Sequence, residues 1–198
     1  MRVLAIDTST LLGSVACVVD GELRAEVSAR VRARHGETVF TLLEQVLAHA
    51  EVERDALDLI ACGLGPGSFT GTRVGVAAAK GLALALDKPL VGVSTLRALA
   101  LAAPGEVLAP VVDAHKGEVF VGVYARTTAG LEERAASAHG DPAAVEAGFR
   151  REASRRPAFG ALAARVRVLD PELFGANPGL RLPDAARRLR EIAGGGAG

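Results

Sequence analysis

The order of apolar and polar positions predicts three strands at the start of the chain. Residues 3–6 form an apolar run that ends at Asp7, and residues 14–19 form a second one. Residues 22–30 alternate between apolar and polar side chains, which is typical of a half-exposed strand. The two-residue connection Asp20-Gly21 favours a hairpin. We therefore expect these strands to form an antiparallel meander.

From about residue 36 to residue 50 the apolar period becomes that of a helix. Phe40 lies off the apolar stripe of this helix, on the side where solvent is expected. Further along, we expect a strand at 57–62, a glycine-rich turn with a long helix after it, a short strand at 91–93 and a helix at about 95–102. A last helix is predicted at 183–192, and residues 193–198 read as a flexible tail.

The helix after the glycine-rich turn has almost no polar side. Between Val74 and Leu86 only Lys80 is charged, and most of the other residues are Gly or Ala. A helix that is apolar all round must be covered on more than one side. Its own sheet can cover one face, and we expect a partner protein to cover the other. The alternative is a central helix enclosed within the monomer.

A similar pattern occurs twice along the chain. An apolar strand ending in Asp7 is followed by a turn and a strand at residues 13–16, and an apolar strand ending in Asp113 is followed in the same way at residues 117–120. This repeat predicts a duplicated α/β fold with two related lobes, at 1–95 and 96–198.

The amino-acid composition limits the kind of core that the protein can have and the functions that it can perform. Hydrophobic residues make up 49% of the chain and aromatic residues only 4%, so the core must be aliphatic. The formal net charge is zero, which argues against a dedicated nucleic-acid or membrane-surface binder. Cys17 and Cys62 each sit in an apolar strand and are expected to be buried, reduced thiols. Because Asp7 comes too early for a signal-peptide core and no apolar run is long enough to span a membrane, we expect a cytoplasmic protein.

The loop at Gly65–Gly71 does not match a nucleotide-binding motif. A Walker loop requires Lys where Thr72 stands, and the dinucleotide pattern requires Gly where Thr70 stands. Loop amides and the helix N-terminus can still bind an anion. Asp7 and Asp113 are candidates for a magnesium-nucleotide site, but the glycines that usually follow such aspartates are absent. No histidine pair has metal-ligand spacing, so we expect no metal site.

Several motifs occur together in an order that carries a family resemblance. They are Ala5-Ile6-Asp7-Thr8-Ser9, the string GPGSFTG at 65–71 followed by Arg73 and Gly75, Ser94-Thr95-Leu96, and residues 113–120. Together they closely resemble the bacterial TsaB (YeaZ) family. The resemblance implies a duplicated actin-like (ASKHA, ribonuclease H-like) α/β fold, here with a shortened second lobe.

The resemblance also implies a function. TsaB-like proteins are non-catalytic subunits that bind the paralogue TsaD and serve the ATPase TsaE, in threonylcarbamoylation of the tRNA adenosine beside the anticodon. They pair with themselves through the same helices and meet tRNA only through the complex. The resemblance implies no firmly assigned cofactor; the one candidate is a nucleotide, ATP or ADP, at or near the partner interface. The alternative function is a stand-alone actin-like ATPase or kinase that uses Asp7 and Asp113.

Two sets of site residues follow from the resemblance and the motifs. No catalytic residue and no metal ligand is expected. The partner interface is expected at Glu37, Phe40, Thr41, Glu44, Thr70, Arg73, Val74, Ala77, Ala78, Gly81 and Leu82. A weak nucleotide or anion contact is assigned to Asp7, Thr8, Ser9, Ser68, Asp113 and Lys116.

Overall fold

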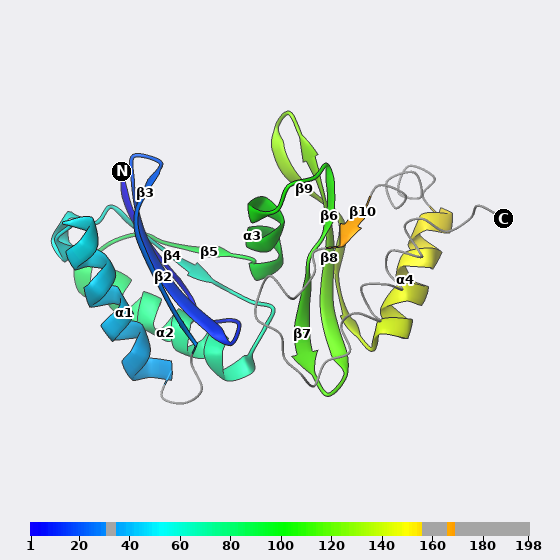
Figure 1. The fold of residues 1–198 in the computed structure, drawn as a ribbon, viewed down its shortest axis with the longest axis horizontal. Coiled ribbons are helices and arrows are strands. Elements are labelled where there is room, and N and C mark those ends of the chain that lie inside the picture. The colour runs from blue at the N-terminus through cyan, green and yellow to red at the C-terminus, as the bar shows by residue number, and fades with distance from the viewer. Residues whose placement is uncertain (31–34, 156–165, 169–198) are drawn as a thin grey trace. The chain divides into compact units, whose positions relative to one another are not determined.

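The chain contains two compact units, Met1–Thr95 and Leu96–Gly198. The structure, a computed structural model, describes residues 1–30, 35–155 and 166–168 (Figure 1). Each unit has its own sheet of five strands.

The sheet of the first unit begins with the antiparallel meander that the sequence predicts. Strands β1 (Arg2–Asp7), β2 (Leu12–Val19) and β3 (Glu22–Arg30) pair in sequence order. The connection at Asp20-Gly21 has both residues at positive φ, 53° and 87°, as a tight hairpin turn requires. Strands β4 (Leu59–Gly63) and β5 (Leu90–Val93) then add in parallel beside β1, which gives the order β3-β2-β1-β4-β5.

Two helices cover one face of this sheet. Helix α1 (His35–Ala50) contacts β2 and β3, and helix α2 (Phe69–Leu86) contacts β4, β1 and β5; the two helices also contact each other (Figure 1). A 3-10 turn, η1 (Arg54–Ala56), lies between α1 and β4. The buried side chains shared by the sheet and α1 include Leu4, Ile6, Val15, Ile60, Val39, Leu42, Leu43, Val46 and Leu47. The core is therefore aliphatic, as composition requires.

Both cysteines are buried in this core as free thiols, which confirms the interpretation from the sequence. Cys17 lies on β2 and Cys62 on β4. Burial raises the pKa of each thiol, so both stay protonated and unreactive near neutral pH.

The second unit begins with helix α3 (Thr95–Ala102), whose first residue is the last residue of the first unit. Its strands are β6 (Val107–Ala109), β7 (Val111–His115), β8 (Glu118–Thr127), β9 (Gly130–Gly140) and β10 (Val166–Val168), with helix α4 (Pro142–Arg155) between β9 and β10. Strand β8 pairs antiparallel with β6 and β7 along one edge and with β9 along the other. Strand β10 pairs in parallel with β6.

The two sheets repeat one topology. In the first unit the chain runs β1, β2, β3, α1, β4, and in the second it runs β6 with β7, β8, β9, α4, β10. In both, the first segment pairs antiparallel with the next strand and in parallel with the strand after the helix. The predicted duplication is confirmed, and Asp7, paired with Ser14, corresponds to Asp113, paired with Val119.

The remaining predictions concern the C-terminal part of the chain and the possibility of a membrane-spanning helix. The predicted helix at 183–192 and the tail after residue 193 lie outside the described residues. Of the arginine cluster at 150–156, all but the last residue belongs to α4. Among the described residues, no helix combines the length and the apolar character that crossing a membrane requires.

Candidate partner-binding surface

Helix α2 has one buried and one exposed side, although its sequence is apolar on both. Gly71, Gly75, Ala78, Ala79 and Ala83 are buried against the sheet. The exposed residues of α2, most of them on the opposite side of the helix, are Phe69, Thr70, Arg73, Ala77, Lys80, Gly81, Leu84 and Ala85. The exposed side carries two cations and no carboxylate, because α2 contains no acidic residue.

Large apolar side chains stand out on the exposed sides of the two helices. On α2, Leu84 is 85% exposed and Phe69 is 69% exposed, and on α1 Phe40 is 52% exposed. The guanidinium carbon of Arg73 lies 3.6 Å from the centroid of the Phe69 ring, a cation–π contact. Thr41 and Glu44 are exposed on the same helix as Phe40. We call the exposed residues of the two helices the α1–α2 surface: on α1 these are Phe40, Thr41 and Glu44, and on α2 they are Phe69, Thr70, Arg73, Ala77, Lys80, Gly81, Leu84 and Ala85.

The structure corrects part of the predicted interface. Ala78 is only 8% exposed and belongs to the core, and Val74 and Leu82 are half-buried against the same core. Because Gly and Ala occupy both sides of α2, its sequence gave no hydrophobic contrast from which the covered side could be identified. Glu37 lies in the first turn of α1, where the structure describes no side chain.

The segment after β1 forms a buried junction with the glycine-rich loop. Thr8 and Ser9 are 2% and 1% exposed. The Thr8 hydroxyl donates to the Gly71 carbonyl at 2.6 Å, and the Ser68 amide donates to the Ser9 carbonyl at 2.6 Å. The Ser9 amide and hydroxyl both donate to Asp7 Oδ1, at 2.7 and 2.5 Å, and the Thr95 hydroxyl donates to Ser9 Oγ at 2.9 Å.

Two glycines of α2 allow this close approach. A Cβ atom at Gly71 would lie closer than 3.0 Å to the Thr8 carbonyl oxygen, and one at Gly75 closer than 3.0 Å to Thr8 Oγ1. Ser68 is the N-cap of α2, and its hydroxyl accepts from the Gly71 amide at 3.2 Å. The glycine-rich loop is therefore built to receive the end of β1.

The resemblance implies a weak nucleotide or anion contact at Asp7, Thr8, Ser9 and Ser68, and the structure shows how their polar groups are bonded. Asp7 Oδ1 already accepts two hydrogen bonds, and the hydroxyls of Thr8 and Ser9 donate within the junction. The Ser68 hydroxyl caps the helix that would otherwise face a phosphate. The polar groups predicted to contact an anion are thus engaged in the junction, and the anion contact itself stays a prediction.

The corresponding turn of the second unit is exposed. The His115 amide donates to Asp113 Oδ1 at 2.6 Å, the same two-residue step by which the Ser9 amide contacts Asp7. His115 Nδ1 also lies 3.5 Å from Asp113 Oδ2. Lys116 is exposed in the β7–β8 turn, with a positive φ of 56°. Throughout the described ranges, no three His, Cys, Asp or Glu side chains come together as metal ligands.

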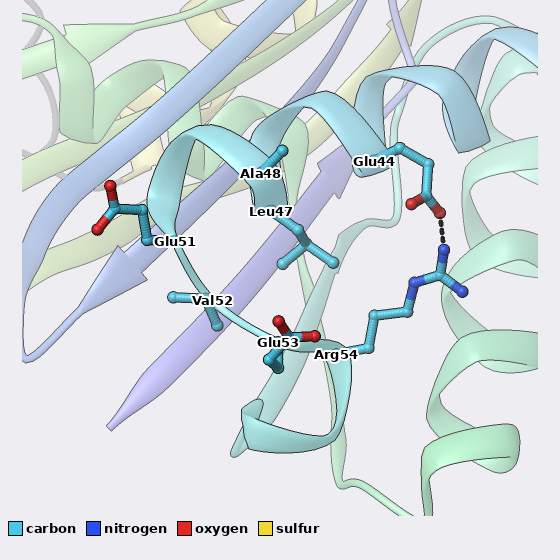
Figure 2. A pocket seen from close by; sticks show the side chains of 7 residues that line it. All are labelled: Glu44, Leu47, Ala48, Glu51, Val52, Glu53 and Arg54. Carbon is cyan, nitrogen blue, oxygen red and sulfur yellow. Dashed lines mark hydrogen bonds and ion pairs between the residues drawn. The ribbon is translucent and has the colours of Figure 1, made fainter.

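An open pocket of about 290 Å³ lies where the C-terminal end of α1 meets η1. Figure 2 shows its lining side chains: Glu44, Leu47, Ala48, Glu51, Val52, Glu53 and Arg54. Arg54 bonds the carboxylate of Glu44, and this hydrogen bond lowers the pKa of Glu44. The pocket could not be predicted from the sequence, because its lining comes from a helix end and a turn that no motif marks.

Comparison with known proteins places these features in a family. The family model for tRNA N6-adenosine threonylcarbamoyltransferase, TsaD, matches residues 27–160. The tRNA threonylcarbamoyladenosine biosynthesis protein TsaB of Escherichia coli is 38% identical over 136 residues, which cover 66% of this chain and 58% of that protein. The chain thus matches little more than half the length of this relative.

Two further comparisons extend the match. An uncharacterized protein of Mycobacterium bovis is 34% identical over 201 residues, which cover 92% of this chain and 93% of that protein. Among solved structures, YeaZ from Pseudomonas aeruginosa superposes with a TM-score of 0.66 at 33% identity, over 71% of this chain and 67% of that one. The two repeated sheets, the junction at GPGSFTG and these matches agree: the fold is actin-like, and the chain belongs to the TsaB (YeaZ) family.

Proposed function

We propose that this chain is a non-catalytic subunit that binds a TsaD-like protein during threonylcarbamoylation of tRNA adenosine next to the anticodon. Relatives that are 38%, 36% and 34% identical to this chain over the matched residues carry the name tRNA threonylcarbamoyladenosine biosynthesis protein TsaB. In this proposal a TsaE-like ATPase joins the complex, tRNA is met only through it, and the protein works in the cytoplasm.

The observation that carries the proposal is the apolar exposure on the α1–α2 surface. Leu84 and Phe69 leave 85% and 69% of their surface in contact with water. Leaving large apolar side chains exposed to water is unfavourable, and surfaces that carry several of them often mark protein–protein contacts. Small residues beside them, Ala77 and Gly81, allow the backbone of a second helix to approach α2 closely.

The polar residues of the surface suit a protein partner as well. Arg73 is held over the Phe69 ring, so the pair presents a broad, flat contact with one positive charge. Aromatic and arginine side chains are the commonest anchors in protein interfaces. Because α2 carries Arg73 and Lys80 without a carboxylate, a partner with acidic residues at its rim complements it. The same surface is proposed to pair two copies of this chain when TsaD is absent.

The hydrogen bonds within the junction at residues 7–9 support the proposed non-catalytic role. The carboxylate and the hydroxyls at residues 7–9 bond to one another and to α2, so they are engaged in holding helices and strands together. No part of the proposal requires a nucleotide bound by this unit. ATP or ADP at or near the partner interface is part of the proposal.

The experiment has two parts. The purified chain is mixed with the TsaD-like protein of the same organism, and association is measured by sedimentation velocity. Bulk tRNA nucleosides from depleted cells are then analysed by mass spectrometry. We expect a 1:1 complex and loss of threonylcarbamoyladenosine. Absence of association at micromolar concentration contradicts the proposal, and steady ATP hydrolysis by the isolated chain that Asp7→Ala abolishes favours the stand-alone enzyme.

A further inference from the structure

We infer that Thr8 is a positioning residue for the α1–α2 surface: its hydroxyl, set between two glycines of α2, fixes how that helix lies on the sheet and therefore how its exposed side meets a partner. The inference rests on the proposed function, because it concerns the same surface. It adds a residue that is itself 2% exposed and lies on the covered side of the helix.

The contact between Thr8 and α2 is close and specific. Thr8 Oγ1 donates to the Gly71 carbonyl oxygen at 2.6 Å. One turn further along α2, Gly75 leaves room for the same oxygen, since a Cβ atom there would lie closer than 3.0 Å to it. The hydroxyl thus occupies a notch in the helix that only glycine at position 75 leaves open.

The helix is also tied to β1 at its start. The Ser68 amide donates to the Ser9 carbonyl, next to Thr8, and the Ser68 hydroxyl accepts from the Gly71 amide. Ser9 is in turn held by Asp7 and by the Thr95 hydroxyl after β5. The N-terminal turn of α2 is therefore attached at two neighbouring points, and Thr8 supplies the one that reaches into the helix.

A displacement of α2 at its contact with Thr8 also moves the exposed residues of the α1–α2 surface. Residues on an α-helix turn by about 100° each, so Arg73 lies on the opposite side of α2 from Gly71 and Gly75. Arg73 carries the contact with Phe69, and Ala77 follows one turn later. Because an α-helix moves as a stiff element, displacing its buried side displaces these exposed side chains relative to α1 by a similar amount.

The neighbouring Thr72 provides a matched control. Its Oγ1 is buried and has no hydrogen-bond partner among the described residues, whereas Thr8 Oγ1 is bonded to Gly71. Thr8→Val and Thr72→Val each replace a hydroxyl by a methyl group of similar size. Both changes remove a buried hydroxyl, but only Thr8→Val removes a hydrogen bond that holds α2.

The test measures the dissociation constant for the TsaD-like protein by calorimetry, for the wild type, Thr8→Val, Thr8→Ser and Thr72→Val, each shown to be folded by circular dichroism. Without this bond α2 can shift on the sheet, and restoring its position in the complex costs binding free energy; Thr8→Val is therefore expected to bind several-fold more weakly, with the value of one hydrogen bond, about tenfold, as the upper limit. Thr8→Ser keeps the hydroxyl and is expected to restore binding, and Thr72→Val is expected to bind like the wild type. If Thr8→Val does not fold, Thr8→Ala, which adds no atom beside Gly75, takes its place.

The results of this experiment distinguish a failure of the positioning role of Thr8 from a failure of the proposed function. A Thr8→Val protein with a lower melting temperature and an unchanged dissociation constant overturns the positioning role and leaves the proposed function intact. Equal weakening by Thr8→Val and Thr72→Val also overturns it, because a general loss of packing then explains both. A wild-type chain that binds no TsaD-like protein refutes the proposed function, and the positioning role with it.

Discussion

The guanidinium of Arg73 lies over the ring of Phe69, 3.6 Å from its centroid, on the exposed side of a helix whose opposite side is almost entirely Gly and Ala. This arrangement divides α2 into a surface for a partner and a surface for the core. Adjacent residues can therefore have opposite roles, and substitutions at neighbouring positions distinguish them.

Ala77 and Ala78 form the sharpest such pair. Ala77 is exposed and Ala78 is 8% exposed within the core. Ala77→Arg should leave the fold intact and weaken binding to the TsaD-like protein, because a long charged side chain blocks close approach of the partner. Ala78→Arg should lower the free energy of unfolding by about 3 kcal/mol or more, because it buries an unpaired charge. Urea unfolding and calorimetric binding, carried out on both variants, check this. An Ala77→Arg protein that unfolds as readily as Ala78→Arg would show that the exposed side has been assigned wrongly.

Gly75 and Gly81 should respond oppositely to the same substitution. Gly81→Ala is expected to stabilise the protein by about 0.5–1 kcal/mol, because Ala favours a helix interior and nothing lies within 4 Å of the added Cβ. Gly75→Ala is expected to destabilise it, because the new methyl group meets Thr8 Oγ1. Thermal unfolding of the two variants tests the notch. If Gly75→Ala stabilised the protein as much as Gly81→Ala, Thr8 would not occupy the space that Gly75 leaves open.

Arg126 is expected to stabilise the second unit. Its side chain donates to the backbone carbonyls of Gly105, Ala100, Leu101 and Ala103, which lie in or just after the last turn of α3. These carbonyls have no partner within the helix, and a cation also favours the negative end of the helix dipole. Arg126→Ala should lower the free energy of unfolding by about 1–3 kcal/mol. Arg126→Lys should recover only part of it, because an ammonium group cannot spread its donors as a guanidinium does. Denaturant unfolding of both variants provides the measurement, and a silent Arg126→Ala would exclude this role.

Glu44 should titrate below the usual glutamate range in the folded protein. The hydrogen bond from Arg54 lowers the pKa of its carboxyl. A group with a lowered folded-state pKa contributes stability above its unfolded pKa and loses that contribution as pH falls through the folded value. The contribution should be small, because both side chains are more than half exposed. Carbon-detected NMR titration of Glu44 should show its pKa rising in Arg54→Gln; an unchanged titration would contradict the pairing.

The sequence predicted the elements that have a clear pattern. The Asp20-Gly21 hairpin, the stripe of α1 and the repeat of Asp7 at Asp113 were all confirmed, because turn chemistry and apolar period determine them locally. The exposed position of Phe40 was also anticipated from its place off the stripe. Strands β9 and β10 and helix α4 were not predicted, because their segments are rich in Ala and Arg and carry little periodic contrast.

The junction was the part of the site that the sequence concealed. The resemblance and the motifs assigned Thr8 and Ser9 to a weak nucleotide or anion contact. In the structure the Thr8 hydroxyl and the Ser9 carbonyl bond backbone groups far along the chain, at Gly71 and Ser68, and the Ser9 hydroxyl bonds Asp7 and Thr95. One signal was present, the spacing of Gly71 and Gly75 by one helical turn, but only tertiary structure shows which segment fills the space they leave.

The most direct test of the account is hydroxyl-radical footprinting of the chain with and without the TsaD-like protein. Phe40, Phe69 and Leu84 are exposed in the free chain and reactive towards the radical. The account predicts that all three lose reactivity in the complex, while Leu23, exposed on β3, keeps it. Protection of Leu23 with unchanged reactivity at Phe69 and Leu84 would show that the partner docks elsewhere and that the α1–α2 surface is not the binding site.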